Sequence, residues 1–369
     1  MAPVPRIITP FRPRGIGTLQ PNNPEKPQYE LCPVAQRGAR IQIIVSYSIA
    51  IEGFDQLAPS WHKLILDCPG SSVFLTPQWH QTWWRHFGSG ELLLLAVRNE
   101  GELSGVAPLM KVEGGLSLLG SSDVCDYLDF ISRPQDAEGV CRAVFDWVRP
   151  QPWDNLDLFS LPARSVIRRH FIPLAAANNL TVREEPEDVS LLMDLPGTWE
   201  DYLSGLARSD RHELRRKMRR LAGEPGVARE IVSDTEHFDR DMEDFFRLFL
   251  DSREAKSQFL TTQRADFFKD IVRVMADNGW LKLFFLTISG VRVATAIIFD
   301  YGDTFYLYNS GYDQRYAHLG VGLLLKAQCI QEGIDRGQRR FDFLRGKEPY
   351  KYQLGGRDQT VYRCRISRS

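Results

Sequence analysis

The residues best suited to carry chemistry lie in the last third of this chain, where a predicted strand leads into a long helix. The connection between the strand expected over residues 304–310 and the helix expected over residues 319–336 reads GYDQRYAHLGVG. Gly320 and Gly322 stand at the mouth of that helix and carry no Cβ atoms. An anionic group can therefore approach the backbone N–H groups at the positive end of the helix dipole. A GxG of this kind also fits tight strand-to-helix packing, and it lacks the third glycine of the dinucleotide-binding fingerprint.

A second polar cluster follows in RRFDFLRGKEPYKYQLGG, residues 339–356. Asp342 lies inside an otherwise apolar strand, where an unpaired carboxylate is costly. We expect it either to pair with a cation such as Arg345 or to face a cleft, so a structural and a catalytic role both fit the pattern. Six residues after the strand form the cluster: Arg345, Gly346, Lys347, Glu348, Tyr350 and Lys351.

The third feature is a basic helix expected over residues 209–221, SDRHELRRKMRRL. Its arginines and lysines fit either a solvated surface or contact with phosphate groups. The whole chain has 46 Lys+Arg and 47 Asp+Glu, so its formal charge is 46 − 47 = −1. This balance argues against a DNA-binding protein, and the local basic excess fits one anionic ligand better than a long polyanion.

The elements that position these residues begin after a proline-rich stretch. Residues 1–40 contain eight prolines and are expected to form a disordered tail. Beyond them, short apolar runs separated by turn residues predict an antiparallel meander over residues 92–119, and a second one over residues 280–310. Each is followed by a predicted helix, residues 137–148 and 319–336.

The two halves of the chain can be overlaid, which suggests a duplicated α+β unit. Gly101 in the first meander corresponds to Gly290 in the second, an offset of 290 − 101 = 189. Asp157 in LDLFS corresponds to Asp342 in FDFLR, an offset of 342 − 157 = 185. In the first half, the sequence also predicts a strand over residues 127–131, between the meander and the strand that contains Asp157.

Composition excludes several classes of protein. The 369 residues are 43% hydrophobic, which is ordinary for a globular protein. Six scattered cysteines form no CxxC pair, and no HExxH, GxSxG or GxxxxGK[ST] occurs, so we expect no metal site and no common hydrolase or triphosphatase centre. No run reaches the roughly 18 apolar residues of a membrane span. The first forty residues lack the apolar segment of a signal peptide, and we expect a cytoplasmic protein.

Six segments together resemble the GNAT superfamily of acyl-CoA N-acyltransferases, in the branch shared with FemAB-type transferases and CelD-like proteins of bacterial polysaccharide operons. They are FLTPQWHQTWWRHFG, GELSGVAPL, DYLDF, RHELRRKMRRL, GYDQRYAHLGVGLLL and RFDFLRGKEPYKYQLGG. The resemblance covers most of the chain from about residue 41. It implies an α+β protein made of tandem GNAT folds, with mixed central sheets flanked by helices. The expected domains are residues 41–196, which help to form an acceptor cleft without doing chemistry, and residues 197–369, which hold the acyl-CoA.

The resemblance also implies an acyl-CoA site. The turn at residues 319–322 would hold the pyrophosphate through backbone amides, and the strand at 304–310 would bind the pantetheine and polarise the thioester carbonyl. Family members carry R/Q-x-x-G-x-G/A at the turn, and Ala317 stands here at the first polar position. The implied acyl-CoA-binding residues are Asn309, Ser310, Leu319, Gly320, Val321 and Gly322.

Catalytic residues follow from the same resemblance. PYKYQLGG is similar to the aromatic-Lys-x-x-aromatic-Gly motif of FemAB-type enzymes, with Leu354 where an aromatic residue is usual, and Lys351 would contact the substrate or the developing negative charge. An amine that attacks a thioester must lose a proton, and the oxyanion needs fixed donors. Asp342 and Glu348 are the candidate bases, and Tyr350 is the candidate proton donor to the leaving thiolate. The expected substrate-binding residues are Arg215, Arg345 and Glu348.

The expected function is therefore an N-acyltransferase that uses acetyl-CoA or another acyl-CoA, needs no metal, and acts on an amine of a small molecule or glycan precursor. The family context suggests polysaccharide or cell-envelope biosynthesis, with polysaccharide-synthesis proteins as partners. One alternative is a FemAB-like transferase that uses aminoacyl-tRNA; the basic helix favours it and the lack of an inserted coiled-coil arm argues against it. Another is a catalytically degenerate scaffold of a polysaccharide-synthesis complex, which Ala317 favours.

Overall fold

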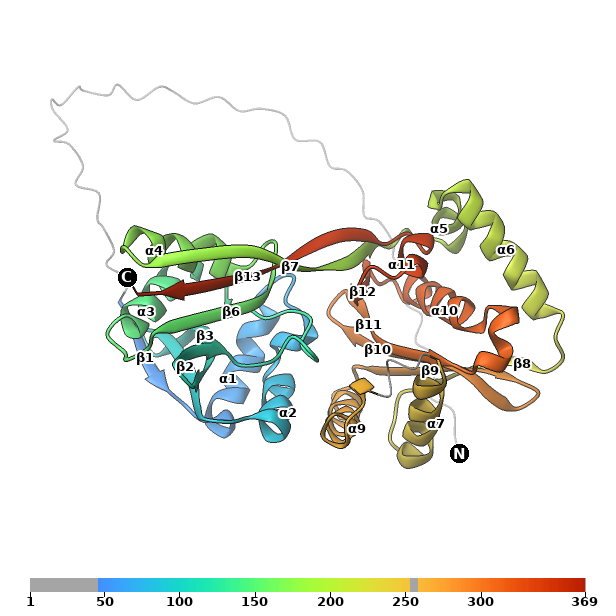
Figure 1. The fold of residues 1–369 in the computed structure, drawn as a ribbon, viewed down its shortest axis with the longest axis horizontal. Helices are drawn as coiled ribbons and strands as arrows, with labels where there is room; N and C mark the ends of the chain where they lie inside the picture. Colours follow the sequence, from blue (N-terminus) through green and yellow to red (C-terminus); the bar gives the residue numbers. More distant parts are fainter. Residues whose placement is uncertain (1–45, 253–257, 369) are drawn as a thin grey trace, which may run out of the picture. The chain divides into compact units, whose positions relative to one another are not determined.

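The computed structural model describes residues 46–252 and 258–368, and the tail expected over residues 1–40 lies outside these ranges. The described residues belong to one compact unit, built on a single mixed sheet in the order β1-β2-β3-β4-β6-β13-β7-β12-β11-β10-β9-β8, with β5 paired to β3. Helices flank this sheet (Figure 1). The expected α+β class with a mixed sheet flanked by helices is confirmed.

The first group of elements, which we call the N-terminal lobe, runs from β1 to β7. Its strands and helices are β1 (Tyr47–Ile51), α1 (Phe54–Leu66), α2 (Pro77–Phe87), β2 (Glu91–Asn99), β3 (Glu102–Val112), β4 (Gly115–Leu118), β5 (Ile131–Ser132), α3 (Ala137–Val148), β6 (Asn155–Pro162), α4 (Ile172–Ala177) and β7 (Thr181–Asp194).

The second group, the C-terminal lobe, runs from α5 to β13. Its elements are α5 (Trp199–Gly205), α6 (Arg208–Ala222), β8 (Val227–Val232), α7 (Phe238–Asp251), α9 (Thr262–Asp277), β9 (Leu281–Ile288), β10 (Val291–Tyr301), β11 (Thr304–Tyr312), α10 (Val321–Asp335), β12 (Arg340–Arg345), α11 (Pro349–Gln353) and β13 (Arg357–Ser367). A short 3₁₀ helix, Gln314–Leu319, joins β11 to α10.

The two lobes repeat one topology. In each, an antiparallel meander ends in a strand that pairs in parallel with the next: β4 with β6, and β11 with β12. The hairpin turns are also alike. Glu100 and Gly101 have φ of 49° and 85°, and Ser289 and Gly290 have φ of 49° and 79°, as two-residue type I′ turns require. The expected tandem arrangement is thus confirmed.

Two long strands belong to both halves of the sheet. The C-terminal strand β13 pairs with β6 through residues 361–367, while the end of β7 pairs with β12 (Figure 1). The lobes therefore exchange their last strands, and each uses a strand from the other to complete its sheet. The division into domains 41–196 and 197–369 stays a prediction about independent folding.

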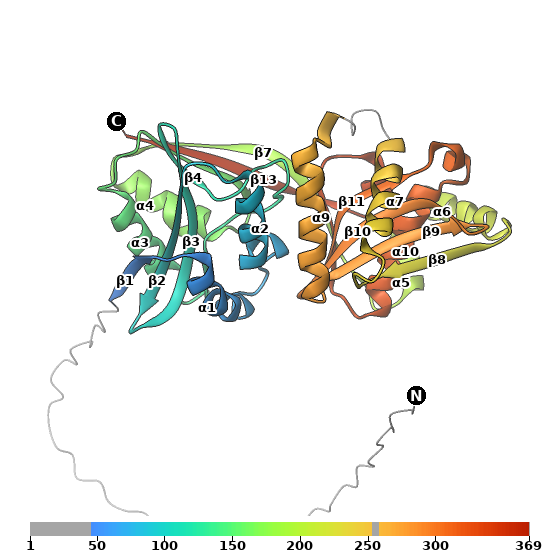
Figure 2. The ribbon, with the colours of Figure 1, turned by 90° about the horizontal axis from the view of Figure 1, so that it is seen from below.

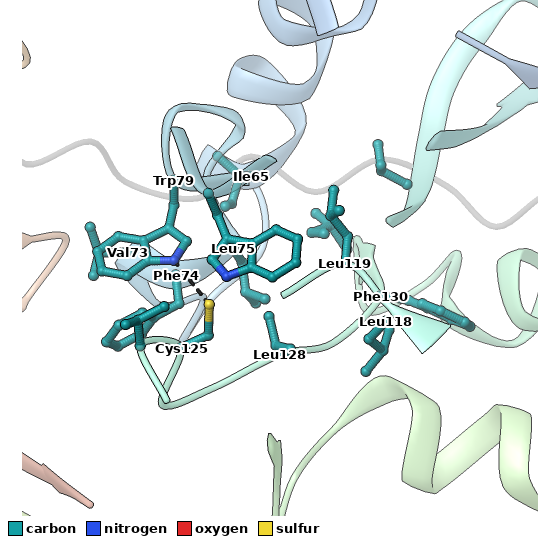
Figure 3. Packing of buried hydrophobic residues seen from close by; sticks show 14 of the residues in the cluster. Ile65, Val73, Phe74, Leu75, Trp79, Leu118, Leu119, Cys125, Leu128 and Phe130 are labelled. Carbon is teal, nitrogen blue, oxygen red and sulfur yellow. Dashed lines mark hydrogen bonds between the residues drawn. The ribbon is translucent and has the colours of Figure 1, made fainter. Parts of the chain in front are cut away.

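Helices cover both faces of the C-terminal half of the sheet. In Figure 2, α7 and α9 lie on the face opposite α10. On the α7 and α9 side, Trp79 of α2 reaches across the lobes: its ring centroid lies 5.9 Å from Phe267 and 5.4 Å from Tyr308, and its Nε1 donates to Cys125 Sγ at 3.2 Å (Figure 3). Trp79 and Trp83 of α2 are both buried in this core.

One predicted element is wrong. The apolar segment at residues 127–131 predicts a strand, but only Ile131–Ser132 pairs with another strand, and the segment before it is a buried loop. Asp129 explains the difference, because its carboxylate accepts hydrogen bonds from Ser165 Oγ and from the amides of Val166 and Ile167, which fixes the loop without a ladder. Across the described ranges, no helix combines the length and apolarity needed to cross a bilayer.

Candidate functional site

The candidate site begins where β11 and β12 separate. The two strands pair in parallel only from Thr304 and Arg340 to Tyr306 and Asp342. Beyond this point each strand is irregular: Tyr308 is an extra residue of β11 opposite β10, and Phe343 is an extra residue of β12 opposite β7. Bulges of this kind bend a strand and increase its twist. The strands diverge as a result and leave a fork between them.

A cavity of about 430 Å³ occupies the fork. It is bounded by the separated ends of β11 and β12, the start of α10, α11, and residues from α6 and the loop after β4. Its lining residues include Asp126, Lys217, Asn309, Ser310, Tyr312, Ala317, Gly320, Val321, Gly322, Lys326, Leu344, Arg345, Glu348, Tyr350 and Lys351. Of the six expected acyl-CoA-binding residues, five line this cavity; Leu319 does not and is buried.

The start of α10 is shaped by its two glycines. Gly320 caps the helix with φ of 73°, a left-handed conformation that glycine adopts without a Cβ penalty. Gly322 lies against the ring of Tyr312, and a Cβ added there would be 2.7 Å from Tyr312 Cδ1. The first turn of a 15-residue helix therefore faces the cavity with its N–H groups and with no side chain at these two positions.

Asp342 lies at the base of the fork and is 5% exposed. The Leu344 amide donates to its Oδ1 at 2.8 Å, and the Tyr127 hydroxyl donates to its Oδ2 at 2.9 Å. Burial raises the pKa of Asp342 to about 7, while these two hydrogen bonds oppose the shift. Asp342 was expected either to pair with a cation such as Arg345 or to face a cleft. It faces a cleft: its carboxylate accepts hydrogen bonds from Tyr127 and Leu344. The Arg345 guanidinium instead donates to the N-terminal lobe.

Lys351 is placed to hold the backbone of the fork. Its side chain is 3% exposed, and Nζ donates to the carbonyls of Leu344, at 3.0 Å, and Arg345, and pairs with Glu348 Oε2 at 3.0 Å. Leu344 has φ of 60°, a strained value for a branched residue. Lys351 thus holds two successive backbone carbonyls, those of Leu344 and Arg345, at the wall of the cavity.

Arg345 joins the two lobes. Its amide donates to Asp126 Oδ1 at 3.0 Å, and its guanidinium donates to the Asp126 carbonyl at 3.2 Å and to Ser160 Oγ. The guanidinium also lies 3.7 Å from Glu187. Its side chain is therefore committed to the N-terminal lobe, although the residue lines the cavity. Burial raises the pKa of Asp126, and Arg345 opposes that shift.

The aromatic ring of Tyr350 forms part of the cavity wall. Lys326 Nζ lies 4.6 Å from the ring centroid and donates to the Gly322 carbonyl at 3.1 Å. Glu348 precedes α11 and lines the same wall. The cavity thus brings together Tyr350, Lys351, Glu348 and Arg345, and their roles in catalysis and substrate binding stay predictions.

The basic helix is confirmed as α6, but it presents a different residue from the one expected. Arg215 is exposed, pairs with Glu200 at 2.9 Å and does not line the cavity. Lys217, two positions later, does line it, and its aliphatic stem lies over Gly320. Sequence reasoning also missed Asp126 and Tyr127. The DYLDF segment was noted only for its resemblance, and nothing local indicates that its polar residues meet β12.

A second cavity, of about 1290 Å³, lies on the other side of the same wall. We call it the acceptor-side cleft. Asp342 and Tyr127 line it, whereas their neighbours Phe343 and Asp126 line the smaller cavity. The Asp342–Tyr127 pair therefore stands between the two spaces.

This arrangement suits a group transfer between two ligands. Helix N–H groups and Lys217 offer an anion site in the smaller cavity. In the wall toward the larger cavity, the buried Asp342 carboxyl, whose pKa is about 7, can accept a proton. Within the described residues, no group of three His, Cys, Asp or Glu side chains could hold a metal ion.

Comparison with known proteins agrees with this geometry. Residues 208–352 match the family model described as an acetyltransferase (GNAT) domain. FemX shares the fold over 86% of this chain and 96% of its own, with a TM-score of 0.58 and 10% identity. The C-terminal domain of a putative lysylphosphatidylglycerol synthetase from Agrobacterium fabrum does so over 86% and 93%, with a TM-score of 0.56 and 10% identity. No curated protein matches the sequence significantly.

Proposed function

We propose that this chain, which belongs to the GNAT superfamily through its acetyltransferase domain at residues 208–352, transfers an acyl group from an acyl-CoA to an amine. The observation that carries the proposal is the cavity at the fork of β11 and β12. There the start of α10 and the separated strands meet within one space, and the buried carboxyl of Asp342 lies in the wall between this space and the second cavity. A small molecule or glycan precursor would supply the amine.

The donor would lie with its phosphates at the start of α10. The N–H groups of the first helical turn lie at the positive end of the helix dipole. Lys217, whose stem lies over Gly320 and whose ammonium lies 3.6 Å from Glu213, adds a cation that a phosphate can contact. Ala317 lines the same cavity without a polar group. We therefore assign to Lys217, from a different helix, the cationic contact that position 317 lacks.

Asp342 would accept the amine proton. Its carboxyl is ionised above a pKa of about 7, so a substantial fraction is available as a base at neutral pH. Tyr350, on the cavity wall, would supply a proton to the leaving thiolate. Lys351 is a positioning residue in this account, because its ammonium group is bonded to the Leu344 and Arg345 carbonyls and to Glu348.

Calorimetric titration with CoA tests the donor site. Lys217→Ala should weaken CoA binding by about tenfold, the effect of losing one charged contact worth about 1.4 kcal/mol. Arg215→Ala on the same helix is the matched control, because Arg215 pairs with Glu200 outside the cavity. Equal effects of the two substitutions, or no CoA binding by the unaltered protein, would refute the assignment.

A second donor deserves the same titration, because α6 places several exposed arginines near the cavity. Arg216, Arg219 and Arg220 are exposed on the helix whose Lys217 lines the cavity. Such a surface suits the phosphates of an aminoacylated RNA. Binding of tRNA at low salt that weakens steeply as salt rises, with no binding of CoA, would favour this donor over acyl-CoA.

A further inference from the structure

Neighbouring residues of the same two segments line the acceptor-side cleft and the cavity at the fork of β11 and β12, which we call the donor cavity. Asp126 and Phe343 face the donor cavity, while Tyr127 and Asp342 face the cleft. A ligand in the cleft can therefore contact Asp342 directly, next to the residues that line the donor cavity. At about 1290 Å³ the cleft exceeds the range of roughly 300–1,000 Å³ that is usual for small-molecule pockets. An extended ligand fits it better than a single small amine.

The charges around the cleft are uneven. Its lining includes Arg164 and Arg169 from the N-terminal lobe, and Arg339 and Arg340 from the start of β12. The last two share Asp303, which pairs with Arg340 and lies 3.9 Å from Arg339.

Arg164 and Arg169 differ from that pair. Both are exposed, and across the described ranges neither forms an ion pair with a carboxylate; the Arg169 guanidinium donates to the Arg164 carbonyl. Of the acidic residues in the cleft, Asp129 is occupied by backbone amides, and Asp194 lies at the end of β7. Two cations without acidic partners thus remain at the N-terminal-lobe end.

The distance from these arginines to Asp342 can be judged from strand register. Asp342 is level with Leu192, which is level with Arg357 at the start of β13. Val361, four residues further along β13, pairs with Pro162, and Arg164 follows two residues later. Four residues of strand span roughly 13 Å, and the three steps between neighbouring strands, from β12 across β7 and β13 to β6, add roughly 14 Å at right angles to that. The cation pair and the carboxyl are therefore well separated within the lining of the cleft.

We infer that the acceptor is an extended amine whose far end carries an anionic group, a carboxylate or a phosphate, held by Arg164 and Arg169 while the amine reaches Asp342. This inference rests on the proposed function for the role of the amine. The binding of the anionic end is a property of the cleft alone.

Matched probes of suitable length test it. Tetraglycine and its C-terminal amide differ in a carboxylate, and 8-aminooctyl phosphate and 8-aminooctan-1-ol differ in a phosphate. In calorimetry with the full chain, the anionic member of at least one pair should bind about tenfold more tightly than its neutral partner. The pair that shows the difference identifies the anion.

The variants decide where the probes bind. Arg164→Gln, alone and with Arg169→Gln, should bring the anionic probe to within about twofold of the neutral one. Arg142→Gln, on the exposed face of α3, should leave the difference intact. Equal binding of the acid and neutral members, or a difference that survives the double substitution, would overturn the inference. A separate titration with CoA distinguishes the anion site in the cleft from the proposed acyl transfer. If the unaltered protein does not bind CoA but binds the anionic probe through Arg164 and Arg169, only the proposed function is refuted.

Discussion

At the scale of single residues, the account depends on how Asp342 is held. Its carboxyl is buried and accepts two hydrogen bonds from different parts of the chain. One comes from the Leu344 amide, two residues later, and the other from the Tyr127 hydroxyl in the other lobe. Burial favours the neutral carboxyl and the hydrogen bonds favour the carboxylate, so the pKa settles at about 7. A small change in either effect should be visible in the pH dependence of transfer.

Asp342→Asn should lower kcat by about 10²–10⁴-fold, the usual contribution of a general base. In the unaltered protein, Asp342 is protonated below its pKa, so the rate should rise with pH up to about 7 and then level off. The Asn variant should lose this rise, which is the acidic limb of the pH profile. A full pH profile of acetyl transfer measures both effects, and an unchanged limb near pH 7 in the variant would exclude Asp342 as the base.

Tyr127→Phe should move the same limb without abolishing activity. The hydroxyl donates to the carboxylate and so stabilises the charged form, and its loss should raise the pKa of Asp342 by about half to one pH unit. The limb then shifts to higher pH. Tyr352→Phe, at an exposed position of α11, serves as the control. A shift to lower pH, or equal shifts in both variants, would contradict the pairing.

Part of this residue-scale chemistry could be read from the sequence. Asp342 was recognised because an acid in an apolar strand demands a partner or a cleft. The partner was not predictable: Arg345 is only three residues away in sequence but binds Asp126, and Tyr127 lies 215 residues away. Contacts of this kind depend on how the lobes pack, which no local pattern encodes.

At the scale of elements, the site depends on a bulged pair of strands and on the helix that follows. The strand–turn–helix order was predictable because β11, the turn and α10 are consecutive. The fork itself was not, since the bulges at Tyr308 and Phe343 arise from pairing with β10 and β7. The predicted strand at residues 127–131 failed for a related reason: its apolar side chains are buried without strand pairing, because the hydrogen bonds of Asp129 fix the segment as a loop.

Gly322→Val should close the donor cavity. Its side chain would begin 2.7 Å from Tyr312 Cδ1 and push that ring or the first turn of α10 into the space assigned to the donor. We expect CoA affinity to fall at least tenfold. Gly205→Ala, where an added Cβ meets no atom within 4 Å, is the control and should bind CoA normally. Unaltered CoA binding by a folded Gly322→Val protein would place the donor elsewhere.

At the scale of the whole molecule, the two lobes are tied by exchanged strands and a shared aromatic core. The duplication was predictable from two nearly constant offsets, 189 and 185, because related turns and strands keep related sequences. The exchange of β7 and β13 was not, because a strand's partner is set by tertiary packing and either pairing would satisfy the same apolar pattern. Arg345 and Tyr127 cross between the lobes at the same place, so the catalytic wall itself depends on their docking.

Ile366→Ala should destabilise the whole described unit. Ile366 is fully buried in β13, between Leu156 of β6 and Val182 of β7. Truncation of a buried isoleucine costs about 2–5 kcal/mol. Because the sheet is continuous, urea denaturation should show one transition, shifted to lower urea for far-UV dichroism and tryptophan fluorescence alike. Two separate transitions, with only one of them shifted, would show that the lobes unfold independently.

The most direct test of the central claim is a crystal structure of the protein grown with CoA. The account predicts the phosphates at the start of α10 beside Lys217, the pantetheine between the diverging strands β11 and β12, and the thiol directed toward the wall formed by Asp342 and Tyr127. CoA bound outside this fork, or a fork without CoA at a concentration that saturates the protein in calorimetry, would contradict it.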